Sequence, residues 1–317
     1  MLLVLGWTLL LAVGVLLLVK GADMLVEGGS MIAAYLGVPT LIIGLTLVSF
    51  GTSLPELGAS LNALVKGRSG ISVGNVIGSN IANILLVLGV SSIIKPISVD
   101  VAIIKKEIPV MFGAMVLFIL VAGPFFSGVY EINRWQGVIL LLALAAYLIF
   151  FGSAVLKSSE EETPVKLDGE DFDWKVSIAK VAAGISGVIL GSELAIRAAI
   201  FYIGRFDMVE GVVGLTIIAI ATSLPELSTS SMAAIRDEAD ISLGNVIGSN
   251  TFNILMVIGI SAVVLPLTFS GEIYSSFIVM IVASVFLTTS MYTGKKISRI
   301  EGIVMLIVYF AYIAYIY

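Results

Sequence analysis

The chain contains two copies of one unit, and this duplication restricts its fold more than any other feature of the sequence. Residues 38–96 align with residues 208–266 at a constant offset of 170, without a gap and with 27 identities in 59 positions. Beyond Pro96 the offset falls to 165. The best-matched blocks are Gly51–Leu57 with Ala221–Leu227, and Gly74–Asn80 with Gly244–Asn250. We expect the second copy to repeat the structure of the first.

Composition predicts that both copies lie in a membrane. Of 317 residues, 59% are hydrophobic and only 12% are charged, and the mean hydropathy of +1.12 leaves too little polar surface for a water-soluble globule. Apolar runs close to the ~20 residues needed to cross a bilayer recur along the whole chain. The first run, Leu2 to Val19, lacks a basic start and a small-residue cleavage pattern, so we expect a retained helix rather than a signal peptide.

We therefore predict an all-α membrane protein with ten transmembrane helices, arranged as two inverted five-helix repeats. The first repeat covers residues 1–156, a linker covers 157–174, and the second repeat covers 175–317. Five crossings are an odd number, so the second repeat enters the membrane upside down relative to the first, as in many secondary transporters. The predicted spans are 2–25, 38–65, 71–94, 105–122, 134–156, 175–203, 208–235, 241–266, 272–290 and 298–317.

The distribution of lysine and arginine predicts the orientation. With both termini outside, eleven of these residues fall in cytoplasmic loops and five in outside loops, while Lys180 lies inside a span. The positive-inside rule therefore favours a multi-pass cell-membrane protein with extracellular termini and a cytoplasmic linker. The acidic side chains of the linker are most simply explained as a solvated loop.

The missing residue types narrow the chemistry. The chain has no cysteine and no histidine, which excludes disulfides, thiolate and imidazole metal ligands, and a Ser-His-Asp triad. We expect no catalytic residues and no cofactor, and the net charge of −5 does not suggest a nucleic-acid partner. Any cation that this chain binds must meet oxygen ligands, which suit hard ions such as calcium, magnesium and sodium.

Two glutamates occupy matching positions inside predicted spans. Glu56 and Glu226 stand in apolar segments, where a carboxylate costs several kcal/mol unless it is paired or hydrated. Each follows a proline that cannot donate a helical hydrogen bond, so we expect the helix to break just before it and to free backbone carbonyls for a cation. The predicted breaks lie at Gly51–Thr52 and at Ala221–Thr222.

A polar stripe repeats on the next predicted helix of each copy, with one polar residue every four positions. The two stripes are Asn75, Ser79 and Asn83, and Asn245, Ser249 and Asn253. Such residues can also hold helices together, as can the small-residue motifs of Gly74 and Gly78 and of Gly244 and Gly248. We assign the glycines to packing. The serines and the last asparagine of each stripe are assigned to an ion site, because they are duplicated along with the glutamates.

The duplicated blocks G/A-T-S-L-P-E-L and G-N-V-I-G-S-N resemble the two repeats of the calcium/cation antiporter superfamily, in particular its prokaryotic-type sodium/calcium exchanger branch. The resemblance covers nearly the whole chain. It implies a membrane antiporter that exchanges calcium for sodium, in which the first and sixth spans slide across four central helices to expose the site to each side in turn.

The resemblance also implies a role for each matching residue. Calcium would bind the carboxylates of Glu56 and Glu226 and the carbonyls of Thr52 and Thr222. The implied sodium ligands are the carbonyls of Ser49 and Ala219, the hydroxyls of Thr52, Thr222, Ser79 and Ser249, and the carboxylates of Glu56 and Glu226, with Asn83 and Asn253 at the middle position.

One position departs from part of the family. Potassium-dependent members carry an aspartate where this chain has Asn253, so this site holds two carboxylates rather than three. One calcium ion balances that charge, and we expect exchange without a requirement for potassium.

Three alternatives remain. In a proton/calcium exchanger of the same superfamily the two glutamates would take up protons, but that branch carries an asparagine before its glutamate where this chain has Thr-Ser. A passive cation channel could share the inverted repeat. A membrane-embedded hydrolase would use Ser53 or Ser223, but the sequence sets no histidine or lysine base beside either serine.

Overall fold

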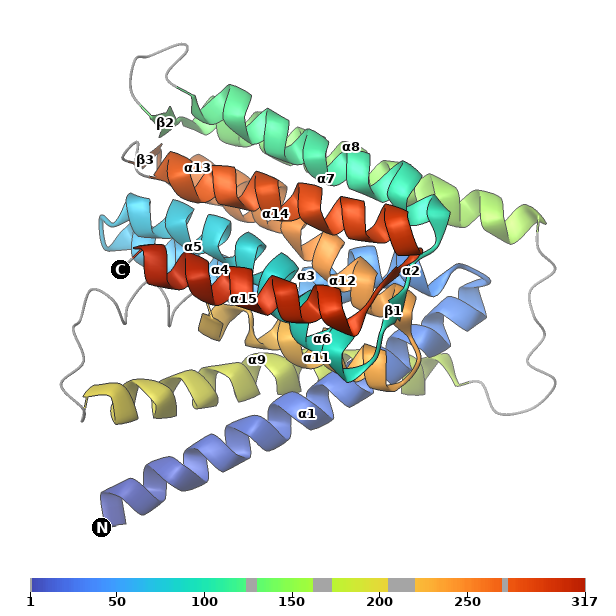
Figure 1. Ribbon diagram of the computed structural model, residues 1–317, viewed down its shortest axis with the longest axis horizontal. Coiled ribbons are helices and arrows are strands. Elements are labelled where there is room, and N and C mark those ends of the chain that lie inside the picture. The colour runs from blue at the N-terminus through green and yellow to red at the C-terminus, as the bar shows by residue number, and fades with distance from the viewer. Residues whose placement is uncertain (1, 124–129, 162–172, 205–219, 270–272, 317) are drawn as a thin grey trace.

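The computed structural model describes residues 2–123, 130–161, 173–204, 220–269 and 273–316. These residues form a helical bundle in which most long helices run roughly side by side (Figure 1). Eight helical stretches among them are long and apolar enough to cross a membrane. The stretches are Val4–Leu36, Thr40–Val65, Ser69–Ile94, Arg134–Phe151, Trp174–Ala198, Ala239–Val264, Ser275–Gly294 and Arg299–Ile316.

The other two predicted spans account for the difference between eight and ten. Span 105–122 corresponds to α7 (Val101–Ala122), which begins with the charged side chains of Lys105, Lys106 and Glu107. Span 208–235 ends in α11 (Leu224–Ile235), and its first part lies outside the described residues. The count of ten therefore stays a prediction.

In the first half, short helices join into the predicted spans. α1 covers Leu2–Leu36; the next span is α2 (Thr40–Ile43), the π-helical turn η1 (Gly44–Val48), α3 (Ser49–Thr52) and α4 (Leu54–Val65). The third span is α5 (Ser69–Ala82), the π-helical turn η2 (Asn83–Val87) and α6 (Leu88–Ile94), and α8 covers Arg134–Glu161.

The second half has the same order. α9 covers Trp174–Gly204 and precedes α11. The next span is α12 (Ala239–Phe252), the π-helical turn η3 (Asn253–Ile258) and α13 (Gly259–Val264), followed by α14 (Ile273–Gly294) and α15 (Arg299–Ile316).

Two predicted boundaries were wrong. α1 continues to Leu36 instead of ending at residue 25, because its acidic residues Asp23 and Glu27 are paired with basic side chains and do not end the helix. α8 continues to Glu161, so the predicted linker starts as a helix; residues 162–172 lie outside the described part of the chain.

Two pairs of short strands join the two halves. We call residues related by the offset of 170 mates. β1 (Ile97–Ser98) pairs with β4 (Lys296–Ile297), and β2 (Glu131–Ile132) pairs with β3 (Leu267–Thr268), all antiparallel. Each two-residue strand thus pairs with a strand of the other half, and these strands are the part of the fold that an all-α prediction left out.

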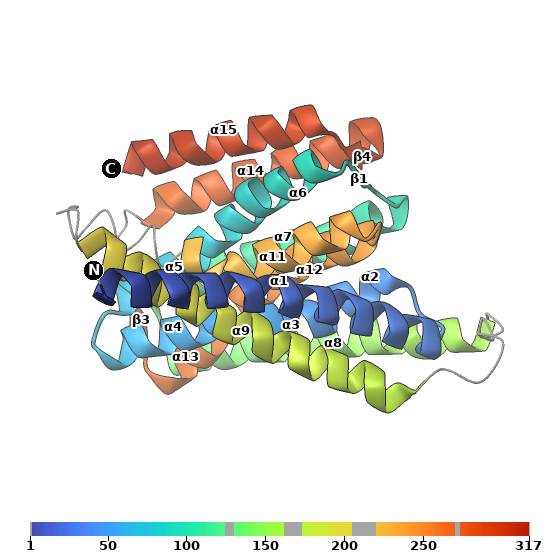
Figure 2. The same cartoon turned by 90° about the horizontal axis from the view of Figure 1, so that it is seen from below.

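α1 and α9 lie side by side and run in opposite directions (Figures 1 and 2). Glycines allow this close approach: a Cβ on Gly14 would lie 2.9 Å from the carbonyl oxygen of Gly191, and a Cβ on Gly21 would lie 2.9 Å from that of Gly184. These two contacts are mates of each other. The offset of 170 therefore also holds between α1 and α9.

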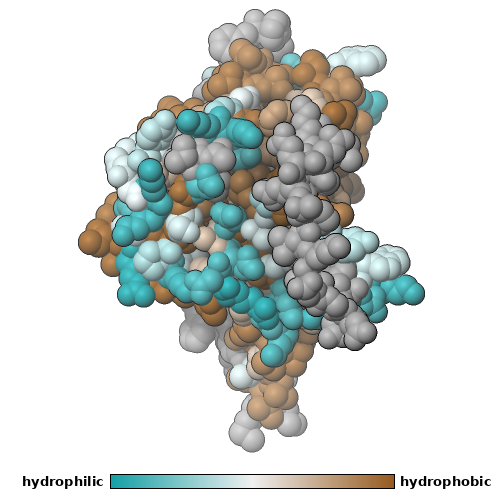
Figure 3. All heavy atoms as spheres, turned by 90° about the vertical axis from the view of Figure 1, so that its right-hand side faces the viewer, coloured by the Kyte–Doolittle hydropathy of each residue, from teal (hydrophilic) through white to brown (hydrophobic). Residues whose placement is uncertain are grey.

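The bundle is apolar outside and polar inside. Large apolar side chains such as Leu9, Leu142 and Ile307 face outward, whereas many serines, threonines and asparagines of α3, α5 and α12 are buried. Hydrophilic side chains gather at the end of the bundle seen in Figure 3, with hydrophobic ones around them. This distribution is typical of a protein whose sides contact lipid and whose polar interior has a function.

Candidate ion-binding site

The helix break of each half lies next to its glutamate. α3 ends at Thr52, and Ser53 leaves the helical conformation with φ −83° and ψ 0° before α4 begins. Ser223 precedes α11 with φ −84° and ψ 2°. The breaks thus lie one residue after the predicted positions. The carbonyl of Ala221, which Pro225 cannot bind, accepts a hydrogen bond from the Ser192 hydroxyl of α9 at 3.0 Å, as expected for a carbonyl freed by proline.

Glu56 and Glu226 lie in the first turns of α4 and α11, and both are 0% exposed. A helix start favours a carboxylate, because unpaired backbone N–H groups point toward it. The two carboxyl groups are close enough for their charges to repel each other. None of their four oxygens has a hydrogen-bond partner among the described residues. Two buried carboxylates without partners are costly unless a cation lies between them.

Hydroxyl groups surround the two carboxyl groups. Thr222 and Ser79 lie beside Glu56, and in the matching arrangement Thr52 and Ser249 lie beside Glu226. Each carboxylate thus has one hydroxyl neighbour from its own half and one from the other half. The site is shared equally by the two halves.

The threonines are held by the polar stripes. The Thr52 hydroxyl donates to Asn245 Oδ1 at 3.0 Å and lies 3.2 Å from the Ser249 hydroxyl. The Thr222 hydroxyl donates to Asn75 Oδ1 at 3.3 Å and lies 3.1 Å from the Ser79 hydroxyl. The first asparagine of each stripe, which the sequence prediction had left without a role, therefore orients a threonine.

Four asparagines lie at the position that the family resemblance implies for the middle of the site. Asn83 Nδ2 donates to Asn250 Oδ1 at 3.2 Å, and Asn253 Nδ2 donates to Asn80 Oδ1 at 3.0 Å. Oδ1 of Asn83 and Oδ1 of Asn253 are buried and have no partner among the described residues. Both side chains stand at the start of a π-helical turn, η2 or η3, and such turns often mark functional sites.

The structure therefore brings together most residues of the predicted site. They are Glu56, Glu226, Thr52, Thr222, Ser79 and Ser249, while Asn83 and Asn253 follow Ser79 and Ser249 by four residues and are buried. The Ser49 carbonyl accepts from the Ser53 amide at 3.0 Å and from the Thr52 hydroxyl at 3.4 Å. Ala219 lies outside the described residues. Ser53 and Ser223 have buried hydroxyls, and none of the described residues makes a hydrogen bond to either of them.

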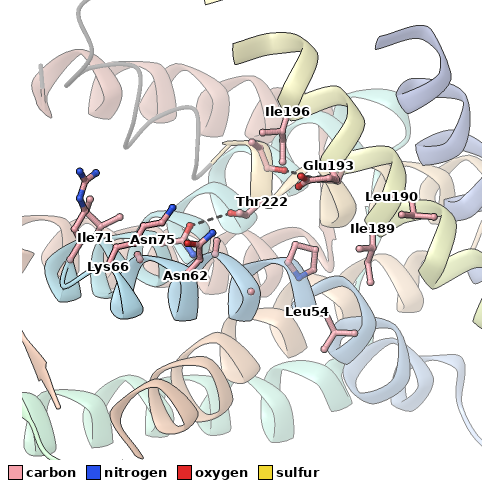
Figure 4. A pocket seen from close by; sticks show the side chains of 17 residues that line it. Leu54, Asn62, Lys66, Ile71, Asn75, Ile189, Leu190, Glu193, Ile196 and Thr222 are labelled. Atoms are coloured by element: carbon pink, nitrogen blue, oxygen red, sulfur yellow. Dashed lines mark hydrogen bonds between the residues drawn. The ribbon is translucent and has the colours of Figure 1, made fainter. Parts of the chain in front are cut away.

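A cavity of about 620 Å³ opens between α4 and α9 and reaches the site (Figure 4). Asn75 and Thr222 line its inner part, and Asn62, Lys66 and Glu193 line its outer part. The cavity therefore extends from exposed side chains to two polar residues of the candidate site.

Comparisons with known proteins agree with this geometry. A family model described as sodium/calcium exchanger protein matches residues 6–152 and 176–317. The sodium/calcium exchanger MaX1 of Methanosarcina acetivorans is 32% identical over 291 residues, which cover 80% of this chain and 82% of MaX1. CaxA of Alkalimonas amylolytica is 34% identical over 256 residues, 78% of each chain. A solved structure of the sodium-calcium exchanger NCX_Mj matches with a TM-score of 0.83 and 32% identity, covering 98% of this chain and 99% of NCX_Mj.

Proposed function

Because this chain belongs to the sodium/calcium exchanger family, a family of multi-pass membrane antiporters, we propose that it exchanges calcium for sodium by alternating access and does not need potassium. Calcium and sodium are the transported substrates, membrane lipid is the surrounding partner, and no cofactor takes part. The observation that carries the proposal is the pair of fully buried glutamates, Glu56 and Glu226, whose four carboxylate oxygens have no partner among the described residues.

Calcium fits the centre of this arrangement. Its two positive charges balance the two carboxylates, and it accepts six to eight oxygen ligands with flexible geometry. The carbonyls of Thr52 and Thr222, next to the helix breaks, would complete the shell. An uncompensated pair of buried carboxylates would cost several kcal/mol, so binding of a cation stabilises the site.

Sodium fits the neutral oxygens around the centre. The hydroxyls of Thr52, Ser79, Thr222 and Ser249 and the carbonyls of Ser49 and Ala219 are ligands for a dehydrated hard cation, and they carry no charge. Asn83 and Asn253 would supply neutral oxygens at the middle position. A site that exchanged calcium only for protons would not need this set, so the ligands support sodium as the counter-ion.

The two halves would alternate access by movement of α1 and α9 across the four central spans. Close glycine packing between α1 and α9 supports a joint movement, because it holds the two helices together as one unit. In this mechanism the cavity between α4 and α9 would be the path open on one side.

The function can be tested by uptake of calcium-45 into proteoliposomes preloaded with sodium, with choline, or with a proton gradient, each with and without potassium. We expect uptake only with internal sodium and the same rate without potassium. Uptake that follows the proton gradient and ignores sodium would assign the protein to the proton-exchanging branch. Calcium flux that needs no counter-ion would indicate a channel.

A further inference from the structure

One ion pair fastens α1 to the end of α11. Arg236, which follows the last residue of α11, donates from Nε to Oδ1 of Asp23 at 2.7 Å, and its Nη2 lies 2.6 Å from the same oxygen. Nη2 also lies 3.7 Å from a carboxylate oxygen of Glu27. Nearby, the Ser30 hydroxyl of α1 donates to Glu238 at 2.8 Å. On this side of the ion site, α1 is thus held to the second half by charge.

The mates of Arg236 and Asp23 carry the same charges, but they do not form an ion pair with each other. At the offset of 170, Arg236 corresponds to Lys66 and Asp23 corresponds to Glu193. The matched glycine contacts of α1 and α9 support this register. No ion pair joins Lys66 to Glu193 in the described residues; the Glu193 carboxylate lies 2.6 Å from Arg197 Nε, one helical turn along α9.

The packing around the two charge pairs differs in the same way. α1 packs closely against α11, where Leu18 and Ala22 form an apolar cluster with Leu224 and Met232. The mate of this contact, between α9 and α4, is replaced by the cavity of about 620 Å³. Lys66 and Glu193 both line that cavity and lie well apart in Figure 4.

We propose that Asp23–Arg236 and Glu193–Lys66 are alternative electrostatic latches, one formed in each access state of the transporter. We call them the Arg236 latch and the Lys66 latch. In the state described here the Arg236 latch is closed and the cavity beside Lys66 is open. When α1 and α9 slide to the other state, the Arg236 latch breaks, the cavity closes, and Glu193 leaves Arg197 to bind Lys66. This inference rests on the proposed alternating access.

The two latches differ in strength. Arg236 contacts Asp23 through two nitrogens of a rigid guanidinium group, whereas Lys66 offers a single ammonium group. The Arg236 latch therefore favours the state in which the cavity is open. Asp23 and Arg236 are about one-third exposed, so the expected effect of each latch on the equilibrium is modest, about two- to five-fold.

A cysteine reporter can measure this equilibrium without transport, because the chain has no cysteine of its own. Thr229 of α11 is 0% exposed and is the mate of Ala59, which lines the open cavity. In the variant Thr229→Cys the thiol reacts with a polar maleimide only when the opposite side opens. Its labelling rate in purified, detergent-solubilised protein therefore reports the minor state.

Loss of the Arg236 latch by Asp23→Asn should raise the labelling rate of Thr229→Cys about two- to five-fold. Loss of the Lys66 latch by Lys66→Gln should lower it by a similar factor. The matched control Lys105→Gln removes an exposed lysine of α7 and should change nothing. The charge-swapped protein, Asp23→Arg with Arg236→Asp, should label at the parent rate, which separates loss of the latch from damage to the fold.

The proposal is overturned if Asp23→Asn leaves the labelling rate unchanged, or if Asp23→Asn and Lys66→Gln shift it in the same direction. A charge swap that fails to restore the parent rate in monodisperse protein also contradicts it. The test is independent of the ions transported. If sodium does not drive calcium uptake but the labelling rates change as expected, the proposed function is rejected and the latches are kept. If sodium drives calcium uptake but the latch variants leave the labelling rate unchanged, the latches are rejected and the proposed function is kept.

Discussion

Asn253 donates a hydrogen bond to Asn80 of the other half at 3.0 Å, and the bond from Asn83 to Asn250 at 3.2 Å is its mate. Each bond uses the Nδ2 atom of Asn83 or Asn253 as the donor, while the Oδ1 atom of the same side chain has no partner among the described residues. A cation at the predicted middle position would therefore meet oxygen and not an N–H group. We therefore expect Asn80 and Asn250 to act as positioning residues that orient the two amides rather than bind the ion.

Removal of this support should weaken ion binding more than it damages the fold. In Asn80→Ala the Asn253 amide loses its acceptor and can rotate its N–H groups toward the ion. Loss of one buried hydrogen bond costs about 1–2 kcal/mol, so we expect the sodium concentration for half-maximal exchange to rise about five- to thirty-fold, with little change in maximal rate. Asn250→Ala should behave in the same way, because it is the mate.

A control for this experiment lies one residue away. Thr251 is buried in α12, and its hydroxyl donates only within the helix, to Ile247 at 3.1 Å. The nearly isosteric change Thr251→Val should leave the sodium dependence of exchange unaltered. Equal effects of Asn250→Ala and Thr251→Val would mean that general disturbance of α12, and not amide orientation, causes the change.

The glutamates themselves should be indispensable. In Glu56→Gln or Glu226→Gln the amide keeps the shape of the side chain but removes one of the two charges that balance calcium. Removal of one partner of a buried charge pair costs about 3–5 kcal/mol. We therefore expect the apparent calcium affinity to fall at least about 100-fold, while the protein still inserts and purifies as a single species.

Sodium-driven calcium-45 uptake of the two purified variants checks this assignment. Glu131→Gln, on strand β2, is the matched control and should keep full activity. Normal calcium affinity in either glutamine variant would show that the site lies elsewhere.

Much of the candidate site could be predicted, because its sequence blocks occur in both halves of the chain. The T-S-L-P-E-L blocks predicted two broken helices with buried glutamates, and the breaks lie at Ser53 and Ser223, one residue from the predicted positions. The role of Asn80 and Asn250 was not predictable, because it depends on a hydrogen bond across the two halves. The G-N-V-I-G-S-N motif contains both residues, but spacing along one helix cannot reveal a partner on another.

The errors in the fold have a physical cause. The first span was predicted to end at residue 25, yet α1 continues to Leu36, because Arg236 and Lys180 neutralise the carboxylates of Asp23 and Glu27. The difference between the α1–α11 contact and the open cavity beside α9 was likewise beyond the sequence. A duplicated sequence predicts two equivalent halves and does not indicate which side is open.

The predicted orientation can be tested with single cysteines. The variant Ser159→Cys, near the linker, should react with a membrane-impermeant maleimide only from the cytoplasmic side, because the linker is predicted to be cytoplasmic. Intact cells and inside-out vesicles provide the two sides of the measurement, and Lys66→Cys is the control for the outer side. Labelling of Ser159→Cys in intact cells would reverse the orientation.

Close packing between α1 and α9 predicts different effects for two glycines of one helix. A Cβ at Gly21 would lie 2.6 Å from the Val188 backbone nitrogen, whereas a Cβ at Gly6 meets nothing within 4 Å. Gly21→Ala forces the two helices apart and should destabilise the protein by about 1–3 kcal/mol. Gly6→Ala removes only the flexibility of glycine and should be neutral or stabilise the helix by about 0.5–1 kcal/mol. Thermal unfolding in detergent compares the two, and equal midpoints would contradict the packing.

Potassium dependence should follow the charge at Asn253. The parent site has two carboxylates for one calcium ion, so an additional potassium ion would lie in an uncompensated positive field. Asn253→Asp adds a third carboxylate at the middle position, beside Asn80, and we expect calcium exchange in this variant to be stimulated by potassium. The mate variant Asn83→Asp tests whether any third charge suffices or whether the second half is special. Calcium-45 uptake at constant sodium, with potassium replaced by choline, measures the effect. If calcium uptake by the parent protein is lost without potassium, the neutral side chain of Asn253 does not determine whether exchange requires potassium.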